Sequence, residues 1–136
     1  MVNIPKEALE MLDNPTCSKE KPITWVSTVN EDGTPHMAPV CVVKAVEEDK
    51  LLIAVTYIMK TAENIKRGSK VAVGAAKYYD GFMVKGTGEI IDTGPLFEDV
   101  KKRVQERFKL TAKAALIVKV EEVYSHKPKS GKKKIA

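Results

Sequence analysis

Residues 23–46 read ITWVSTVNEDGTPHMAPVCVVKAV and hold two apolar runs joined by a polar turn. The first run, ITWVSTV, is rich in β-branched and aromatic side chains, which favour strands. Asp32 and Gly33 follow it, and an Asp-Gly pair between two such runs is a strong hairpin signal. The second run, about residues 36–46, contains Pro39, which indicates a sheet edge, a bulge or a position whose backbone N–H is not needed. These residues predict an antiparallel hairpin.

The rest of the chain repeats this pattern of short strands and turns. We expect further strands over residues 51–55, 71–75, 82–91 and 114–123. We expect helices over KEALEML near the N-terminus, over residues 59–67 with Thr61 as cap and Gly68 as stop, and over about residues 96–108. In the last of these, Leu96, Val100, Val104 and Phe108 fall four apart and predict one narrow buried stripe. Six strands in so short a chain predict a mainly β fold, a small closed or nearly closed barrel with short peripheral helices.

Composition limits the class of protein. The chain has 136 residues, 43% of them hydrophobic, which suits a single globular domain. No run approaches the roughly 20 apolar residues that a membrane-spanning helix needs. Charges interrupt the N-terminal residues before an apolar stretch can form, so we expect no secretory signal and a cytoplasmic location. Cys17 and Cys41 are too few for a disulfide scaffold or a four-ligand zinc site, and we expect no metal.

The net charge of +5 is concentrated at one end of the chain. Residues 127–136, KPKSGKKKIA, contain five lysines and no acid, so residues 1–126 carry 18 basic and 18 acidic side chains. We therefore divide the chain into a neutral domain, residues 1–126, and a basic C-terminal tail, residues 127–136. The tail is either a solvated segment or an electrostatic arm for partners that bear phosphate.

Side chains with catalytic potential are few. The sequence contains only two histidines, His36 and His126, and no GxSxG, P-loop, HExxH or GxGxxG motif. The strand context of Cys41 predicts a small buried apolar residue rather than a nucleophile. If the protein carries out chemistry, we expect a cofactor to supply it.

One pair of residues points to an anion. Lys60 and Thr61 lie where a strand leads into a helix, and a helix N-terminus offers free N–H groups and a favourable dipole to a phosphate. Lys60 adds a positive charge and Thr61 a hydroxyl donor. The same pair also suits an ordinary capped helix beside a solvated lysine, so the pattern alone leaves both interpretations open.

An ordered series of segments resembles the FMN-binding split-barrel family, which includes pyridoxamine 5'-phosphate oxidase-like proteins. The segment IMKTAENI, residues 58–65, is similar to the family's phosphate-binding stretch. Other similar segments are DGTPH at 32–36, KVAV at 70–73, GFMVKG at 81–86, DTGPLFE at 92–98 and AALIVKV at 114–120. The sequence looks most like the small bacterial FMN-binding proteins, and the resemblance spans about 100 residues.

This resemblance implies a six-stranded split β-barrel that forms a homodimer, with FMN at the interface and a redox role. It implies that Lys60 and Thr61 hold the FMN phosphate, with Asn64 nearby. It places the isoalloxazine ring along two strands, at Pro39, Val40 and Cys41 and at Ala54, Val55 and Thr56. Catalytic residues, substrate and redox partner do not follow from it.

The sequence also departs from the family. The small FMN-binding proteins carry bulkier polar and aromatic residues in place of Pro39, Val40 and Cys41, so a split-barrel enzyme that uses a deazaflavin or a haem-type ligand is an alternative. The chain has no arginine beyond Arg107 and lacks the C-terminal arginine and histidine motif of true pyridoxamine phosphate oxidases, so we do not expect that activity. A non-enzymatic module whose basic tail contacts nucleic acid is a further alternative, which the neutral body disfavours.

Overall fold

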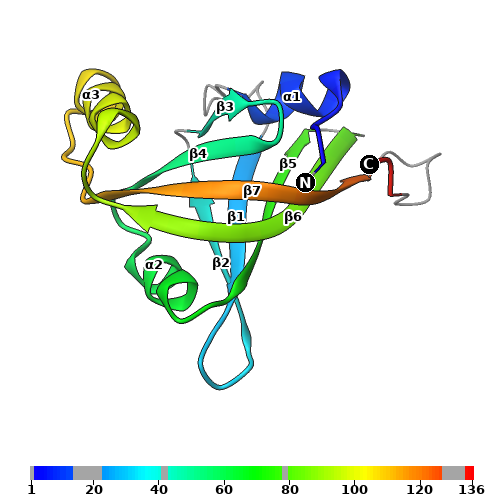
Figure 1. Cartoon of the computed structure of the whole chain (residues 1–136), viewed down its shortest axis with the longest axis horizontal. Helices are drawn as coiled ribbons and strands as arrows, with labels where there is room; N and C mark the ends of the chain where they lie inside the picture. The colour runs from blue at the N-terminus through cyan, green and yellow to red at the C-terminus, as the bar shows by residue number, and fades with distance from the viewer. Residues whose placement is uncertain (1, 14–22, 41–42, 78–79, 127–133) are drawn as a thin grey trace.

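Seven antiparallel strands form one strongly curved sheet in the computed structural model, which describes residues 2–13, 23–40, 43–77, 80–126 and 134–136 (Figure 1). The strand order is β2-β1-β5-β6-β7-β4-β3. The strands are β1 (Ile23–Val29), β2 (Pro35–Val40), β3 (Val43–Glu47), β4 (Lys50–Val55), β5 (Lys70–Lys77), β6 (Asp80–Ile91) and β7 (Ala114–Ser125). The helices are α1 (Lys6–Leu12), α2 (Met59–Lys66) and α3 (Pro95–Phe108).

The predicted mainly β fold with short helices is confirmed, but the predicted count of six strands is wrong. The run over residues 36–46 forms two strands, β2 and β3, instead of one. Pro39 lies near the end of β2, where it pairs with Trp25, and β2 has a neighbour on one side only. An edge strand tolerates proline because the missing N–H would have had no partner in the sheet. β2 and β3 therefore form the two edges of the sheet, and the barrel is split between them.

Two long strands hold the curved sheet together. β6 and β7 have 12 residues each and run side by side in the middle of the strand order, where they join β5 to β4 (Figure 1). Their register shifts between Lys85 and Gly86. A Cβ atom added to Gly86 would lie 1.8 Å from the carbonyl oxygen of Lys119, so the close approach of the two strands at this bulge requires glycine.

The main core lies inside the curved sheet and is closed at one end by α1. Its largest fully buried members include Phe82, Leu12, Leu51 and Ile53. A second cluster lies between α3 and the outer face of β4 and β7, where Phe97, Val100 and Val104 are buried. The predicted stripe on α3 is therefore wrong at both ends, since Leu96 and Phe108 are exposed. β4, which α3 covers through this second cluster, is also the strand that leads into α2.

Both chain ends lie along β7. The N–H of Val2 donates to the carbonyl of Val120 at 3.0 Å. The N–H of Ile135 donates to the carbonyl of Val123 at 2.8 Å, and the N–H of Val123 donates to the carbonyl of Ala136 at 2.9 Å. These contacts cover the part of the β7 edge that extends beyond its pairing with β4.

None of the helices built by the described residues combines the length and the apolar character needed to cross a membrane.

Candidate functional site

The N-terminal end of α2 follows directly from the buried strand β4. Thr56, Tyr57 and Ile58 connect the two elements, and the helix begins at Met59. Ile58 is the N-cap residue and no side chain caps this end, so the expectation that Thr61 caps the helix is wrong. The uncapped first turn leaves backbone N–H groups without an intrahelical partner, as at every helix N-terminus. The helix ends at Lys66 and Gly68 follows with a φ of 102°, which confirms the predicted stop.

Lys60 and Thr61 both lie in this first turn but in different surroundings. The Lys60 side chain is 53% exposed, and its Nζ lies 3.7 Å from Oε2 of Glu63. Thr61 is fully buried, and its Oγ1 has no hydrogen-bond partner among the residues that the structure describes. A buried hydroxyl without a partner costs about 1–3 kcal/mol, so this atom is a candidate contact for a ligand.

A cavity of about 430 Å³ lies next to this turn, between β2, the end of β4 and α3. Ligand sites in proteins commonly have volumes of about 300–1,000 Å³. The cavity is lined by Ala38, Pro39, Val40, Ala54, Thr56, Tyr57, Ile58, Val104, Phe108 and Leu110. Its wall is mostly apolar, and the connection through Tyr57 and Ile58 leads from it into the first turn of α2.

Four of the six residues predicted to lie along a ring come together in this cavity. These are Pro39, Val40, Ala54 and Thr56. Val55 does not line it, because side chains alternate along a strand and Val55 packs into the main core at 1% exposure. Cys41 lies outside the described residues.

Asn64, predicted to lie near the phosphate, occupies the second turn of α2 and is fully buried. Its Nδ2 donates to Oγ1 of Thr28 at 3.0 Å and to Oδ1 of Asn30 at 2.9 Å. Its Oδ1 accepts from Nη2 of Arg67 at 3.0 Å. The side chain thus joins α2 to β1 and to the turn that follows β1.

Sequence reasoning missed the contribution of α3 and of Tyr57 and Ile58 in the β4–α2 connection. Tyr57 is 75% exposed and Phe108 is 38% exposed, and both line the cavity. An aromatic residue directly before a predicted phosphate-binding turn was an available signal for Tyr57. Phe108 carried no such signal, because its spacing with Val104 matched a buried helix face.

The tip of the β1–β2 hairpin carries a fixed negative charge. The backbone N–H and the hydroxyl of Thr34 donate to Oδ1 of Asp32 at 3.0 and 2.6 Å. These hydrogen bonds lower the pKa of Asp32 below its ordinary value, and the positive charge of Lys60 contributes in the same direction. The positive charge of Lys60 therefore interacts electrostatically with the carboxylate of Asp32 and forms an ion pair with that of Glu63.

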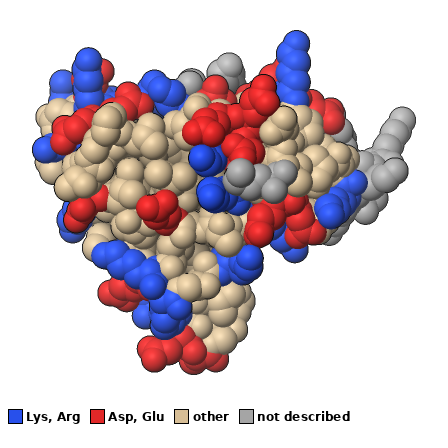
Figure 2. Space-filling view, in the orientation of Figure 1, with Lys and Arg blue, Asp and Glu red and all other residues tan. Residues whose placement is uncertain are grey.

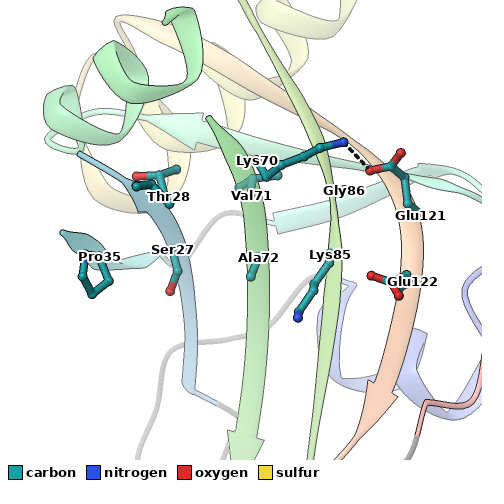
Figure 3. Close-up of a pocket in the computed structure, with 11 residues that line it drawn as sticks. Ser27, Thr28, Pro35, Lys70, Val71, Ala72, Lys85, Gly86, Glu121 and Glu122 are labelled. Carbon is teal, nitrogen blue, oxygen red and sulfur yellow. Dashed lines mark hydrogen bonds and ion pairs between the residues drawn. The ribbon is translucent and has the colours of Figure 1, made fainter. Parts of the chain in front are cut away.

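A second hollow, of about 440 Å³, lies on the outer face of β1, β5, β6 and β7 (Figure 3). Its charged side chains already contact other side chains. Nζ of Lys70 lies 3.1 Å from Oε1 of Glu121, and Nζ of Lys85 lies 5.1 Å from the ring centroid of Tyr124. None of the residues predicted to bind a cofactor lines this hollow. The cavity beside α2 is therefore the stronger candidate for an anionic ligand.

Acidic and basic side chains are interspersed over the face shown in Figure 2. This distribution agrees with the formally neutral body that the sequence predicts. The last described lysine, Lys134, lies 3.5 Å from Oε1 of Glu122. Most of the tail lysines lie outside the described residues.

The family model described as pyridoxamine 5'-phosphate oxidase matches residues 6–127. The chain belongs to this family, as its sequence predicted. An uncharacterized protein of Methanocaldococcus jannaschii, MJ0282, is 32% identical over 123 residues, which cover 85% of this chain and 81% of that protein.

Three solved structures share the fold at lower identity. HupZ of Group A Streptococcus has a TM-score of 0.78 at 23% identity, over 92% of this chain and 95% of its own. An FMN-binding protein of Syntrophomonas wolfei has a TM-score of 0.74 at 21% identity, over 89% and 87%. An F420 reductase has a TM-score of 0.63 at 20% identity, over 88% and 98%. The predicted split-barrel fold is thereby confirmed.

Proposed function

We propose that this protein is an FMN-binding flavoprotein with a redox role. The observation that carries the proposal is the continuity of its candidate site. A mostly apolar cavity, large enough for a flat ring system, leads directly into an uncapped helix N-terminus that bears Lys60 and the unpaired hydroxyl of Thr61. When bound, FMN would supply the electron- or hydride-transfer chemistry, since the side chains of the chain offer little of their own.

The first turn of α2 suits the phosphate of FMN. Its N–H groups and the helix dipole favour a negative charge, and the Lys60 ammonium can turn from Glu63 toward it because the side chain is half exposed. The Thr61 hydroxyl is buried and has no hydrogen-bond partner among the described residues. A phosphate oxygen held at this turn would satisfy its hydrogen-bonding capacity. The residues present therefore fit a phosphate monoester.

The cavity beside this turn suits an aromatic ring. Val40, Ala54 and Val104 are buried side chains that offer an apolar wall, and Thr56 adds a hydroxyl among them. Small residues such as Ala54 leave room for a flat ligand, while Phe108 can cover part of it. These side chains would exclude water from one face of the ring and orient it.

We further propose that a second copy of the chain completes this site as a homodimer. Large apolar side chains are exposed at its rim, where Tyr57 and Phe108 line the cavity and Met59 begins α2. A symmetric partner would bury these side chains and close the open side of the cavity. Size-exclusion chromatography with light scattering tests this: a dimer supports it and a monomer with FMN bound contradicts it.

A deazaflavin is the second candidate cofactor, because an F420 reductase shares the fold. Such a cofactor would keep the redox role and change the ring contacts. Mass spectrometry of the ligand released from protein purified under native conditions separates the two cofactors.

The deciding experiment is a fluorescence titration of purified protein with FMN and, in parallel, with riboflavin. We expect FMN to bind more tightly than riboflavin, because riboflavin lacks the phosphate. Protein that remains colourless and binds no FMN would contradict the proposed function.

A further inference from the structure

Asn64 has no side-chain N–H donor left for a phosphate. A primary amide offers two N–H donors, and both are used by Thr28 Oγ1 and Asn30 Oδ1. Its carbonyl oxygen accepts from Arg67, and the whole residue is buried. A contact with a phosphate would break one of these bonds inside the protein.

The partners of Asn64 tie α2 to one short piece of the barrel. Arg67 Nη2, which donates to Asn64, also donates to the carbonyl of Val29 at 3.0 Å. The N–H of Val29 in turn donates to Oγ of Ser69 at 2.9 Å. We call Thr28, Asn30, Asn64 and Arg67 the α2 clamp, because they join the helix to the end of β1.

A helix of eight residues needs such anchors. It is only about 12 Å long, and isolated helices of this length are marginal in water. Burial of Ala62 and Ile65 holds α2 against the sheet, but apolar packing is not directional. Hydrogen bonds have preferred directions, so the α2 clamp is what fixes the rotation of the helix about its axis.

We infer that Asn64 is a positioning residue, which orients the Lys60–Thr61 end of α2 for a phosphate group without touching it. This inference rests on the proposed function and deepens it. It replaces the role in cofactor contact that the sequence resemblance implied for Asn64. Hydrogen bonds to β1 and to the turn after it hold the second turn of the helix. The first turn of the same helix carries the Lys60 ammonium and the Thr61 hydroxyl, so its orientation follows from that of the second turn.

Two substitutions test this inference, one at the acceptor Thr28 and one at the donor Asn64 of the same hydrogen bond. Thr28→Val removes one acceptor of the clamp with little change of shape, and Thr28 is itself buried on β1, away from the cavity. Asn64→Asp keeps the oxygen that accepts from Arg67 and removes both donors. Ser27→Ala is the matched control, because Ser27 is the neighbouring residue on β1 and its side chain points to the other face of the sheet.

The readout is the affinity for FMN compared with that for riboflavin. We expect Thr28→Val and Asn64→Asp each to weaken FMN binding about threefold to tenfold, because a misoriented first turn of α2 holds the phosphate less well. Riboflavin has no phosphate, so its binding should change less than about twofold. Ser27→Ala should leave both affinities unchanged. A silent Thr28→Val would overturn the inference even beside a damaging Asn64→Asp, because Asn64→Asp also adds a negative charge and only Thr28→Val weakens the clamp without changing charge.

A double mutant tests whether Asn64 affects FMN binding through Lys60. If Asn64 acts through Lys60, then Asn64→Asp should have a smaller effect on FMN affinity in a Lys60→Ala background than alone. Full additivity of the two effects would contradict action through Lys60.

Amide hydrogen exchange, measured without added flavin, tests whether the clamp stabilises α2 independently of cofactor binding. We expect faster exchange in α2 for Thr28→Val and Asn64→Asp, with β6 and β7 unchanged. Unchanged exchange in α2 would overturn the inference even if FMN binds. A different result is faster exchange in α2 of the two variants while the parent protein binds no FMN. That result would refute the proposed function and leave the structural role of the clamp intact.

Discussion

Replacement of Lys60 by alanine is the most direct perturbation of the candidate phosphate site. The change removes one positive charge from the first turn of α2 and also removes the ion pair with Glu63. Both side chains of that pair are more than half exposed, and exposed pairs on one helix contribute about 0.3–0.5 kcal/mol. We therefore expect the free energy of unfolding to fall by less than about 0.5 kcal/mol.

The expected effect on FMN binding is larger. A hydrogen bond between charged groups contributes about 1.5–3 kcal/mol, which corresponds to roughly tenfold to a hundredfold in affinity. Because Lys60 is half exposed and pairs with the competing carboxylate of Glu63, we expect the lower end, about tenfold. Riboflavin, which has no phosphate, should bind with nearly unchanged affinity.

The assay is the quenching of flavin fluorescence on titration with FMN and with riboflavin. Lys66→Ala is the matched control, since it removes the same charge from the other end of the same helix. Equal losses of FMN and riboflavin affinity in Lys60→Ala would contradict a contact between Lys60 and the FMN phosphate. An equal loss of FMN affinity in Lys66→Ala would show that only the overall charge matters.

Three further predictions follow from buried or constrained groups. Thr61→Val should leave stability unchanged or raise it by up to about 1 kcal/mol, because Oγ1 has no partner to lose, and should weaken FMN binding in the same titration. Gly86→Ala should destabilise the fold by about 1–3 kcal/mol in urea unfolding, since its Cβ would meet the Lys119 carbonyl; an unchanged urea midpoint would contradict the close approach of β6 and β7. The lowered pKa of Asp32 means that its bonds to Thr34 stabilise the fold above its unfolded pKa of about 4 and are lost as the pH falls through the folded pKa. Asp32→Asn should therefore make stability depend less on pH below about pH 4, and an unaltered acid limb in the variant would argue against this.

Local patterns in the sequence identified most of the elements. The first strand was predicted over residues 23–29 and is found at Ile23–Val29. The longest helix, predicted over about residues 96–108, is found at Pro95–Phe108. Such elements are set by side-chain periodicity and by nearby turn residues, which a single sequence displays directly.

Contacts between distant residues were beyond these patterns. Asn64 bonds to residues 34 and 36 positions away, so a motif alone could not separate a ligand contact from an anchor. The cavity likewise combines β2 with α3, whose residue Phe108 had the spacing of a buried face. Residues 36–46 divide into β2 and β3, which lie at opposite edges of the sheet, and this strand order depends on pairings between segments far apart in the sequence.

The placement of the two chain ends on β7 has a practical consequence. A strand edge with free N–H and C=O groups invites pairing with another molecule, and here Val2, Ile135 and Ala136 occupy that edge. Shortened forms that lack residues 134–136 would expose it and become prone to aggregation. An affinity tag joined directly to Ala136 would start from a residue engaged in these bonds, so a flexible spacer belongs between them in any binding experiment.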